Sequence, residues 1–188
     1  MNSDKLYIIG VCGKKFRGKD TIANYLVDHY GFIKLAFGDP LKKAIQSIFS
    51  FEDEQLWGNR KEIIDEFWNV SPRDVMQFVG TECFRKTFGE KYNHIGNKIW
   101  IMVMKKNIDK LLASGVRKII ISDLRFQNEE QFIRKLGGIV IRVNRNIPYD
   151  HDDHISENMI DKLRVDHIVQ NDNIHQLYED IDRIMKTY

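Results

Sequence analysis

The stretch GKKFRGKDT, from Gly13 to Thr21, decides the fold that this sequence predicts. Its spacing, G-x-x-x-x-G-K, is that of a phosphate-binding loop, in which glycines let backbone N–H groups turn inward around phosphate oxygens. The apolar run LYIIGVC precedes the loop and the helical pattern DTIANYLVDHY follows it, which is the setting that the motif requires. The start of that helix adds partial positive charge. We expect the loop to bind a nucleotide through Gly13, Lys15, Arg17, Gly18, Lys19, Asp20 and Thr21.

The loop departs from the usual pattern at Asp20, which stands where a hydroxyl side chain normally contacts magnesium. A carboxylate pressed directly on phosphates would be repelled, so Asp20 must face the metal, a bound water or a protein cation. Magnesium keeps several waters in proteins, and we expect Asp20 to contact it through water. Thr21 either assists or packs, and Lys19 reaches the β- and γ-phosphates.

The composition is that of an ordinary globular protein. The chain has 188 residues, of which 43% are hydrophobic and 30% charged, with a formal net charge of +2. This near balance argues against a nucleic-acid-binding surface. The two cysteines, Cys12 and Cys83, suggest neither disulfides nor a zinc site. We see no apolar run of membrane-spanning length and no secretory signal, and we expect a cytoplasmic protein.

Five short apolar runs predict strands that are covered on both faces. They begin at Leu6, Phe32, Lys118, Ile139 and Asp166. Helical patterns alternate with them, which predicts an α/β fold with three layers around a five-stranded parallel sheet. We read residues 1–188 as a single domain. The interval of about residues 40–114 shows no convincing strand, and we interpret it as a helical insertion at the ligand-binding edge of the sheet.

Sequence signals also predict where helices begin. Ser71 is a suitable N-cap, with Pro72 as the first helical residue. Asn128 is the expected N-cap of a second helix, and the last helix begins near Asp172 and runs almost to Tyr188.

The helix that begins after Ser71 carries candidates for binding a second ligand. Arg73 and Gln77 are four residues apart and share one α-helical face, which Thr81 and Phe84 continue. Arginine suits a phosphate, glutamine a base edge, and phenylalanine stacking on a base. The alternatives are a surface position for Arg73 and a core position for Phe84.

Four further candidates lie where strands end, at the edge of the sheet that binds ligands in such folds. Asp39 and Lys42 follow the second strand, and Asp123 and Arg125 end the third. We expect Asp123 to hold a magnesium-bound water. If the site transfers a phosphoryl group, we expect Arg125 to bridge that group and the phosphate of the molecule that accepts it. A strand cap at Asp123 and a surface Arg125 are the alternatives. No glutamate follows Asp123 directly, which argues against a motor-type ATPase that activates water.

The segment NRNIPYDHDDHISENM follows the fourth strand, where a short lid at about residues 145–160 would cover the phosphates. We expect Arg145 to cover the adenine or the γ-phosphate. We do not interpret His151 and His154 as a metal site, because no third nitrogen or sulfur ligand is near them in the sequence.

These motifs, in this order, resemble those of the deoxynucleoside monophosphate kinases of large DNA viruses and bacteriophages, in the P-loop nucleoside monophosphate kinase superfamily. The matching segments are GKDT in the loop, GDPLKKAI, SPRDVMQFVGTECFR, SDLR and QND. The loop variant is also similar to that of animal phosphomevalonate kinase. The resemblance covers most of the chain and implies that Asn171 lies beside the adenine, with helix capping as its alternative role.

The resemblance implies a P-loop kinase fold with a helical acceptor-binding insertion. It implies transfer of a phosphoryl group from ATP to deoxynucleoside monophosphates, with Mg²⁺ as cofactor. Lys19, Asp123 and Arg125 would be catalytic, with Asp20 and Asp123 at the metal. The nucleotide would be contacted by the loop, Arg145 and Asn171, and the acceptor by Asp39, Lys42, Arg73, Gln77, Phe84 and Arg125. The resemblance also suggests a homodimer, and the host cytoplasm if the protein is viral.

Two alternatives stay open on the sequence. A P-loop kinase acting on another acceptor, such as phosphomevalonate or dephospho-coenzyme A, would use the same fold, although the aromatic-rich insertion favours a base. A nucleotide-binding switch without kinase activity is the second alternative, but the chain has no guanine-reading N-K-x-D motif. Neither the base nor the sugar of the acceptor follows from the sequence.

Overall fold

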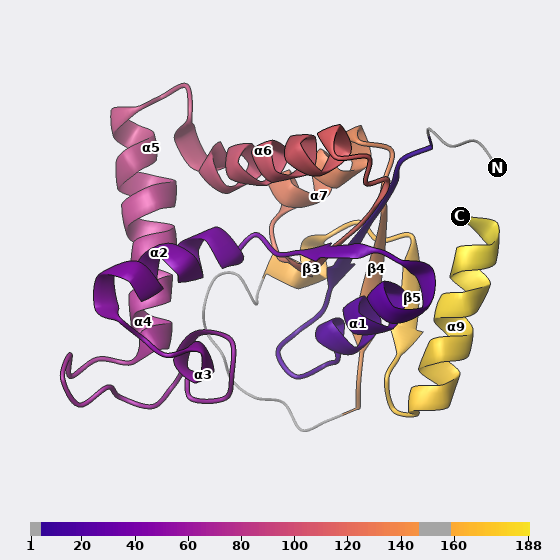
Figure 1. Ribbon diagram of the computed structural model, residues 1–188, viewed down its shortest axis with the longest axis horizontal. Helices are drawn as coiled ribbons and strands as arrows, with labels where there is room; N and C mark the ends of the chain where they lie inside the picture. The colour runs from indigo at the N-terminus through magenta and orange to yellow at the C-terminus, as the bar shows by residue number, and fades with distance from the viewer. Residues whose placement is uncertain (1–4, 147–158) are drawn as a thin grey trace. The chain divides into compact units, whose positions relative to one another are not determined.

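The computed structural model describes residues 5–146 and 159–188 (Figure 1). The chain divides into two units. The sheet unit consists of the residues before Phe37 together with Lys106–Tyr188, and the helical unit consists of Phe37–Lys105. The helical unit overlaps the interval for which we expected an insertion. The expected lid lies largely outside the described residues, and His151 and His154 lie wholly outside them.

In the described residues, five parallel strands form one sheet in the order β2-β3-β1-β4-β5, as predicted. β1 and β3 are almost continuously buried, which agrees with the apolar run that each of them contains. β2 is shorter than the apolar run that predicted it. The strands are β1 (Tyr7–Cys12), β2 (Ile33–Leu35), β3 (Lys118–Leu124), β4 (Ile139–Asn144) and β5 (His167–Gln170).

Helices cover both faces of this sheet (Figure 1). The helices α1 (Lys19–Tyr30) and α9 (Ile174–Thr187) pack on one face. The side chains buried there include Ile9, Val11, Ile120, Ile141 and Val143 from the strands and Leu26, Leu177 and Ile181 from the helices. The helix α7 (Gln127–Lys135) covers the other face, where the Ile133 side chain lies against Gly10. The result is a three-layer α/β fold.

The strand order places a crossover point at β1. The chain passes from β1 to β2 and β3 on one side, and then to β4 and β5 on the other. In open α/β sheets, ligands bind outside the carboxyl ends of the strands at such a point, because the loops there diverge. The loop that leaves β1 after Cys12 is therefore at the favoured position for a ligand site.

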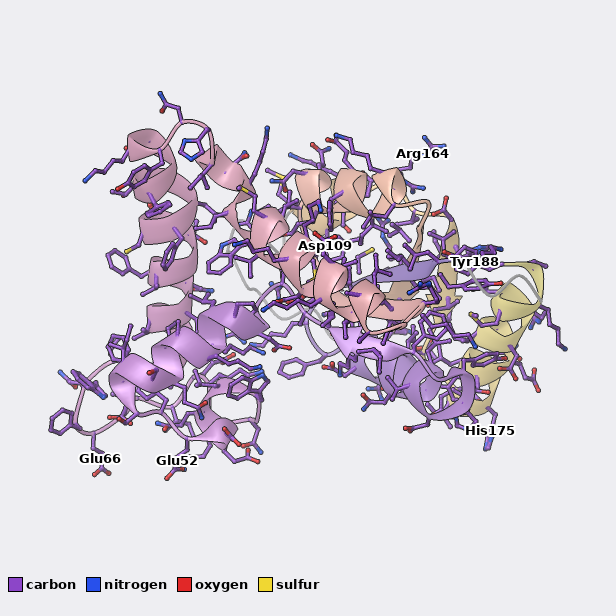
Figure 2. All side chains as sticks on the ribbon, turned by 45° about the horizontal axis from the view of Figure 1, so that its top comes forward. Glu52, Glu66, Asp109, Arg164, His175 and Tyr188 are labelled. Carbon is purple, nitrogen blue, oxygen red and sulfur yellow. The ribbon has the colours of Figure 1, made fainter. Side chains whose placement is uncertain are left out.

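The helical unit has a core of its own, formed by Ile45, Phe51, Leu56 and Val75. Charged side chains such as Glu52 and Glu66 lie on the surface of this unit (Figure 2). Apart from one isolated bridge between Asp65 and Val70, it contains helices and loops. Its helices are α2 (Asp39–Phe49), α3 (Asp53–Leu56), α4 (Pro72–Gln77), η1 (Phe78–Thr87), α5 (Phe88–Lys91), η2 (Gly96–Lys98) and the first half of α6 (Ile99–Ala113).

The helix after Ser71 begins as predicted but changes type. The Ser71 Oγ accepts a hydrogen bond of 3.1 Å from the Asp74 amide, and Pro72 opens α4. From Phe78 the helix continues as the π-helix η1, whose i→i+5 bonds widen each turn. The α-helical spacing that placed Phe84 on the face of Arg73 therefore does not hold beyond α4. A close approach accompanies the change: the Trp100 Nε1 donates to the Gly80 carbonyl at 3.1 Å.

One helix start differs from the prediction, and another is close to it. α7 begins at Gln127, and the predicted N-cap at Asn128 is wrong. The buried Glu129 carboxylate accepts hydrogen bonds from the Arg125 and Phe126 amides at 3.0 and 3.1 Å, so these two residues form the helix entry. α9 begins one residue after its N-cap Asn173, close to the expected position.

The part of the chain that the structure describes has no helix with the length and apolar character needed to cross a membrane.

Candidate active site

The loop between β1 and α1 requires both glycines of the G-x-x-x-x-G-K motif. Gly13 has φ 156° and Gly18 has φ 102°, conformations that side chains rarely adopt. A Cβ on Gly13 would lie 2.6 Å from the Val143 carbonyl oxygen, and one on Gly18 would clash with the Asn171 amide. The loop therefore passes close to the ends of β4 and β5 and turns its backbone toward the start of α1.

The Lys19 ammonium group is held inside this loop. It donates hydrogen bonds to the Gly13 and Lys14 carbonyl oxygens at 2.7 and 2.9 Å. Lys19 is also the first residue of α1, where the free N–H groups and the helix dipole attract anions. Ammonium and helix terminus together form a site for phosphate oxygens, which would replace the two carbonyl partners.

Asp20 faces a protein cation, which was one of the three partners that the sequence allowed. Its Oδ1 lies 2.7 Å from the Lys34 Nζ, and its side chain is 77% exposed. Thr21 is half-buried. The Lys15 ammonium lies 4.9 Å from the centre of the exposed Phe16 ring. The side chains of Asp20 and Lys15 therefore both lie at the surface around the loop.

A hollow of about 230 Å³ opens beside the loop. Four of its lining side chains are cationic and one is a carboxylate, so the hollow favours an anionic ligand. The Lys14 Nζ lies 3.0 Å from the Asp161 carboxylate. The lining residues are Gly13, Lys14, Arg17, Arg142, Asn144, Arg145, Ile160 and Asp161.

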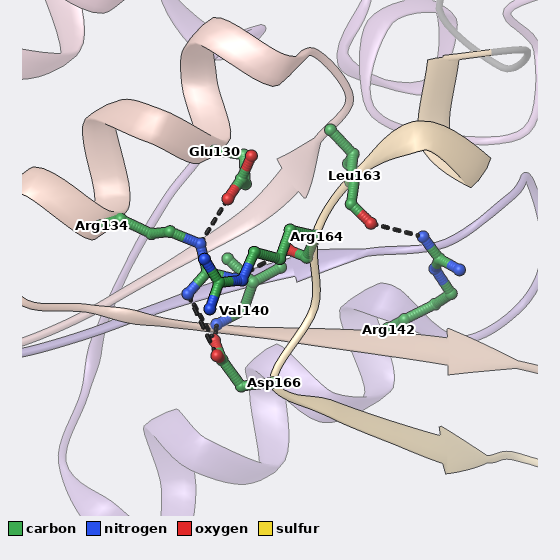
Figure 3. A network of polar contacts seen from close by, with 7 residues as sticks. All are labelled: Glu130, Arg134, Val140, Arg142, Leu163, Arg164 and Asp166. Carbon is green, nitrogen blue, oxygen red and sulfur yellow. Dashed lines mark hydrogen bonds and ion pairs between the residues drawn. The ribbon is translucent and has the colours of Figure 1, made fainter.

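Arg17 and Arg145 were predicted for this site, whereas Lys14, Arg142 and Asp161 were not. Arg142 had a sequence signal, since it is the one charged residue of the buried strand IVIRV. Its guanidinium donates to the Ile160 carbonyl at 2.9 Å. It also donates to the Leu163 carbonyl at 3.0 Å, as Figure 3 shows. Arg142 thereby fixes the short helix η3 (Ile160–Lys162) next to the hollow. Asp161 lacked a signal, because its position depends on this long-range contact.

A second arginine holds the chain just after η3. The Arg134 guanidinium pairs with Glu130 and with Asp166, and it donates to the Arg164 carbonyl at 2.9 Å (Figure 3). Burial opposes ionisation of Asp166, but the Val140 amide and Arg134 outweigh it and lower the pKa of this carboxyl below its ordinary 3.8. The segment that carries Asp161 is thus held at both ends.

Asn171 comes into direct contact with the loop. Its side-chain amide donates to the Arg17 carbonyl at 3.0 Å, and its backbone amide donates to the Asn144 carbonyl at 2.8 Å. The structure therefore brings together the predicted residues Gly13, Gly18, Lys19, Arg17, Arg145 and Asn171. The helix-capping role that we considered for Asn171 belongs instead to Asn173, whose Oδ1 accepts from the His175 amide at 2.9 Å.

Asp123 and Arg125 lie at the same edge of the sheet as the loop. The pairing of Cys12 with Leu124 places the ends of β1 and β3 side by side. Both candidate residues are half-buried. Burial raises the pKa of the neighbouring Cys12 thiol, which is fully enclosed at the end of β1. Asp123 and Arg125 thus lie at the carboxyl end of β3, on the sheet edge from which the loop leaves β1.

The remaining candidates lie in the helical unit. The Asp39 Oδ1 accepts a hydrogen bond of 3.0 Å from the Trp57 Nε1 and lies 3.8 Å from the Lys42 Nζ. The Arg73 Nε lies 3.1 Å from the Glu62 carboxylate. Asp39 is thus in contact with both Trp57 and Lys42, and Arg73 is paired with Glu62.

Gln77 and Phe84 are half-buried. The Phe84 ring contacts the rings of Trp100 and Phe88, with centroids 5.4 and 5.9 Å away. This packing is what its alternative core role requires, and stacking of Phe84 on a base stays a prediction.

The residues described by the structure contain no cluster of three or more histidine, cysteine, aspartate or glutamate side chains able to hold a metal ion. Such a cluster is not needed for magnesium, which binds one or two carboxylates together with substrate phosphates and water. The binding of magnesium through water by Asp20 and Asp123 stays a prediction.

Comparisons with known structures define the class of protein. The crystal structure of TT1252 from Thermus thermophilus matches with a TM-score of 0.54 at 13% identity, covering 98% of both chains. Shikimate kinase from Aquifex aeolicus matches with a TM-score of 0.51 at 12% identity, covering 95% of this chain and 96% of the other. With the loop geometry, this similarity assigns the P-loop kinase fold, as predicted.

The chain belongs to the deoxynucleotide monophosphate kinase family, whose model matches residues 46–181. A protein of Acanthamoeba polyphaga mimivirus, provisionally described as a deoxynucleotide monophosphate kinase, is 35% identical over 182 residues and 94% of each chain. The predicted family and the predicted kinase activity are confirmed, and the family implies ATP and deoxynucleoside monophosphates as substrates.

Proposed function

We propose that this kinase transfers the γ-phosphoryl group of ATP, bound as its magnesium complex, in line to the phosphate of a deoxynucleoside monophosphate. The observation that carries the proposal is the Lys19 ammonium, which is held between the Gly13 and Lys14 carbonyls at the start of α1 and beside a cationic hollow. This arrangement stabilises the charge of a transferring phosphoryl group, which is the main requirement of such reactions.

On this proposal, the chain's own residues position and neutralise the triphosphate. The loop amides and Lys19 bind the β- and γ-phosphates, and Arg17 and Arg145 add positive charge at the hollow. Asn171 keeps the loop closed at the Arg17 carbonyl and lies at the adenine side. A magnesium ion, held through water by Asp20 and Asp123, would offset the charge on the phosphates. Arg125 contacts both the transferred group and the acceptor.

The helical unit supplies the acceptor site. Arg73, oriented by Glu62, binds the monophosphate, and Gln77 and Phe84 contact the base. Asp39 and Lys42, joined through Trp57, contact the sugar or phosphate. The scheme needs no strong general base, because positioning and charge neutralisation account for catalysis of phosphoryl transfer.

The decisive experiment is a panel of acceptors with ATP and magnesium. It compares the four deoxynucleoside monophosphates, their ribose counterparts, phosphomevalonate and dephospho-coenzyme A, with ADP formation as the readout. We expect turnover of at least one deoxynucleoside monophosphate and none of the last two acceptors. ATP hydrolysis without any acceptor, or turnover of phosphomevalonate alone, would contradict the proposal. Sedimentation of the same sample tests the homodimer that the family resemblance suggests.

A further inference from the structure

The contact between Asp20 and Lys34 joins the unusual residue of the loop to the edge strand of the sheet. Lys34 is the middle residue of β2, and its ammonium lies 2.7 Å from the Asp20 carboxylate. It also donates a hydrogen bond of 3.2 Å to the Asn24 Oδ1. The Lys34 side chain, 33% exposed, therefore spans from β2 to the first two turns of α1.

This ion pair contributes little to folding. Its carboxylate is 77% exposed, and exposed ion pairs typically stabilise a protein by only about 0–1 kcal/mol. The position of the pair matters more than its stability, because Asp20 directly follows Lys19 in the first turn of α1. Without a ligand, the helix N-terminus favours a carboxylate there. When ATP binds, its phosphates bring several negative charges to the same helix end.

The repulsion between the Asp20 carboxylate and the phosphates of ATP then depends on the charge of Lys34. A carboxylate at position 20 repels the phosphates in a way that a serine or threonine hydroxyl would not. A cation fixed on that carboxylate offsets part of this repulsion and holds the side chain in one direction. Among the contacts resolved at Asp20, Lys34 provides both the charge and the direction.

We propose that Lys34 is a positioning residue of the nucleotide site, which neutralises and orients Asp20 so that ATP with its metal ion binds beside this carboxylate. The inference rests on the proposed function, in which the loop binds the triphosphate. It follows that the aspartate variant of the loop requires a cation on β2, whereas a hydroxyl at position 20 removes the requirement.

A double-mutant cycle tests this coupling. Lys34→Met, Asp20→Ser and the double variant are compared with Lys34→Arg and with the control Lys118→Met. Lys118 is an exposed lysine at the start of β3, and its ammonium donates to the Tyr30 carbonyl at 2.9 Å. The readouts are the Kd for ATP without acceptor, from calorimetry, and kcat and KM with a deoxynucleoside monophosphate.

In the wild-type background, we expect Lys34→Met to weaken ATP binding about tenfold, the size typical of coupling between contacting residues. Lys34→Arg and Lys118→Met should stay within about twofold of the wild type. In the Asp20→Ser background, Lys34→Met should change ATP binding less than about twofold. The penalty should also shrink as ionic strength rises, because salt screens exposed charges. A purely structural role for Lys34 would not depend on salt or on residue 20.

An equal effect of Lys34→Met in both backgrounds, or equal effects of Lys34→Met and Lys118→Met, would overturn the inference. Thermal melting of each variant identifies any that fails to fold, and Lys34→Gln, which also removes the charge, then replaces Lys34→Met in the cycle. If the wild type binds ATP but phosphorylates no deoxynucleoside monophosphate, the proposed function is wrong. The ATP-binding cycle still decides the role of Lys34 in that case.

Discussion

At the scale of single residues, replacement of the Lys19 side chain should have a large effect on catalysis and a small effect on folding. Its ammonium contacts the loop carbonyls of Gly13 and Lys14, and its chain position at the start of α1 does not depend on its side chain. Its charge is nevertheless at the place where the γ-phosphate would lie. Folding and chemistry can therefore be separated at this residue.

We predict that Lys19→Ala lowers kcat by about two to three orders of magnitude, as removal of one charge-stabilising group typically does. The melting temperature should change little, because no buried contact of the core is lost. Steady-state kinetics and thermal melting measure the two quantities. Lys118→Ala removes another lysine of the sheet unit and should leave kcat unchanged; a similar loss in both variants would contradict the assignment.

Gly18 is the residue whose replacement should damage both the fold and the site. We predict that Gly18→Ala destabilises the protein by about 1–3 kcal/mol and abolishes ATP binding, since φ is 102° and the new methyl group would clash with Asn171. Urea unfolding and calorimetry measure these effects. Gly115→Ala is a matched control, because Gly115 has φ +87° but nothing within 4 Å of its Cβ position. It should show only the smaller backbone penalty and normal ATP affinity.

At the scale of elements, a tyrosine–carboxylate cluster joins α1 to α9. The Tyr30 and Tyr25 hydroxyls both donate to the Asp182 Oδ1, at 2.7 and 2.8 Å. Burial and the Asp182 carboxylate raise the pKa of Tyr30 from its ordinary 10.0 to about 12. Because the folded-state pKa lies above the unfolded one, the contribution of this group is present below pH 10.0 and is lost as the pH rises toward 12.

We therefore predict that the stability advantage of the wild type over Tyr30→Phe is constant up to about pH 10 and falls between pH 10 and 12. Urea unfolding at a series of pH values gives the two free energies. A wild-type advantage that is unchanged at pH 12 would contradict the role of this cluster.

Some of the structural elements could be predicted from the sequence, and others could not. Strands and the loop were predictable because each depends on local patterns: an apolar run, two glycines and a lysine. The π-helix η1 was not, since the α-helical period of its residues gives no signal for wider turns, and its start coincides with close packing around Gly80. The start of α7 was misplaced because the Glu129 side chain, three residues after Phe126, caps it.

At the scale of the whole molecule, the candidate site combines residues that sequence proximity does not connect. Lys19, Gly18 and Arg17 belong to one motif and were predictable together. Arg142 and Asp161 line the hollow beside Arg17 only because β4 lies beside β1 and because Arg142 binds the carbonyls around η3. The roles of Arg73, Gln77 and Phe84 stay predictions, since they depend on a bound acceptor.

The two units give a prediction that involves the whole chain. Each unit has its own core, and we assign ATP to the sheet unit and the acceptor to the helical unit. Hydrogen exchange should therefore show protection of amides 13–19 when ATP alone is added, and of amides near Arg73 when a deoxynucleoside monophosphate alone is added. Identical protection patterns for the two ligands would contradict this assignment.

The hydrogen bond from Asn171 to the Arg17 carbonyl joins residues that are 154 positions apart in the chain. During synthesis on the ribosome, the glycine-rich turn is translated 154 residues before the amide that closes it. Affinity for ATP should thus arise only after Asn171 has been translated, and ribosome-bound chains halted before Asn171 should fail to retain ATP.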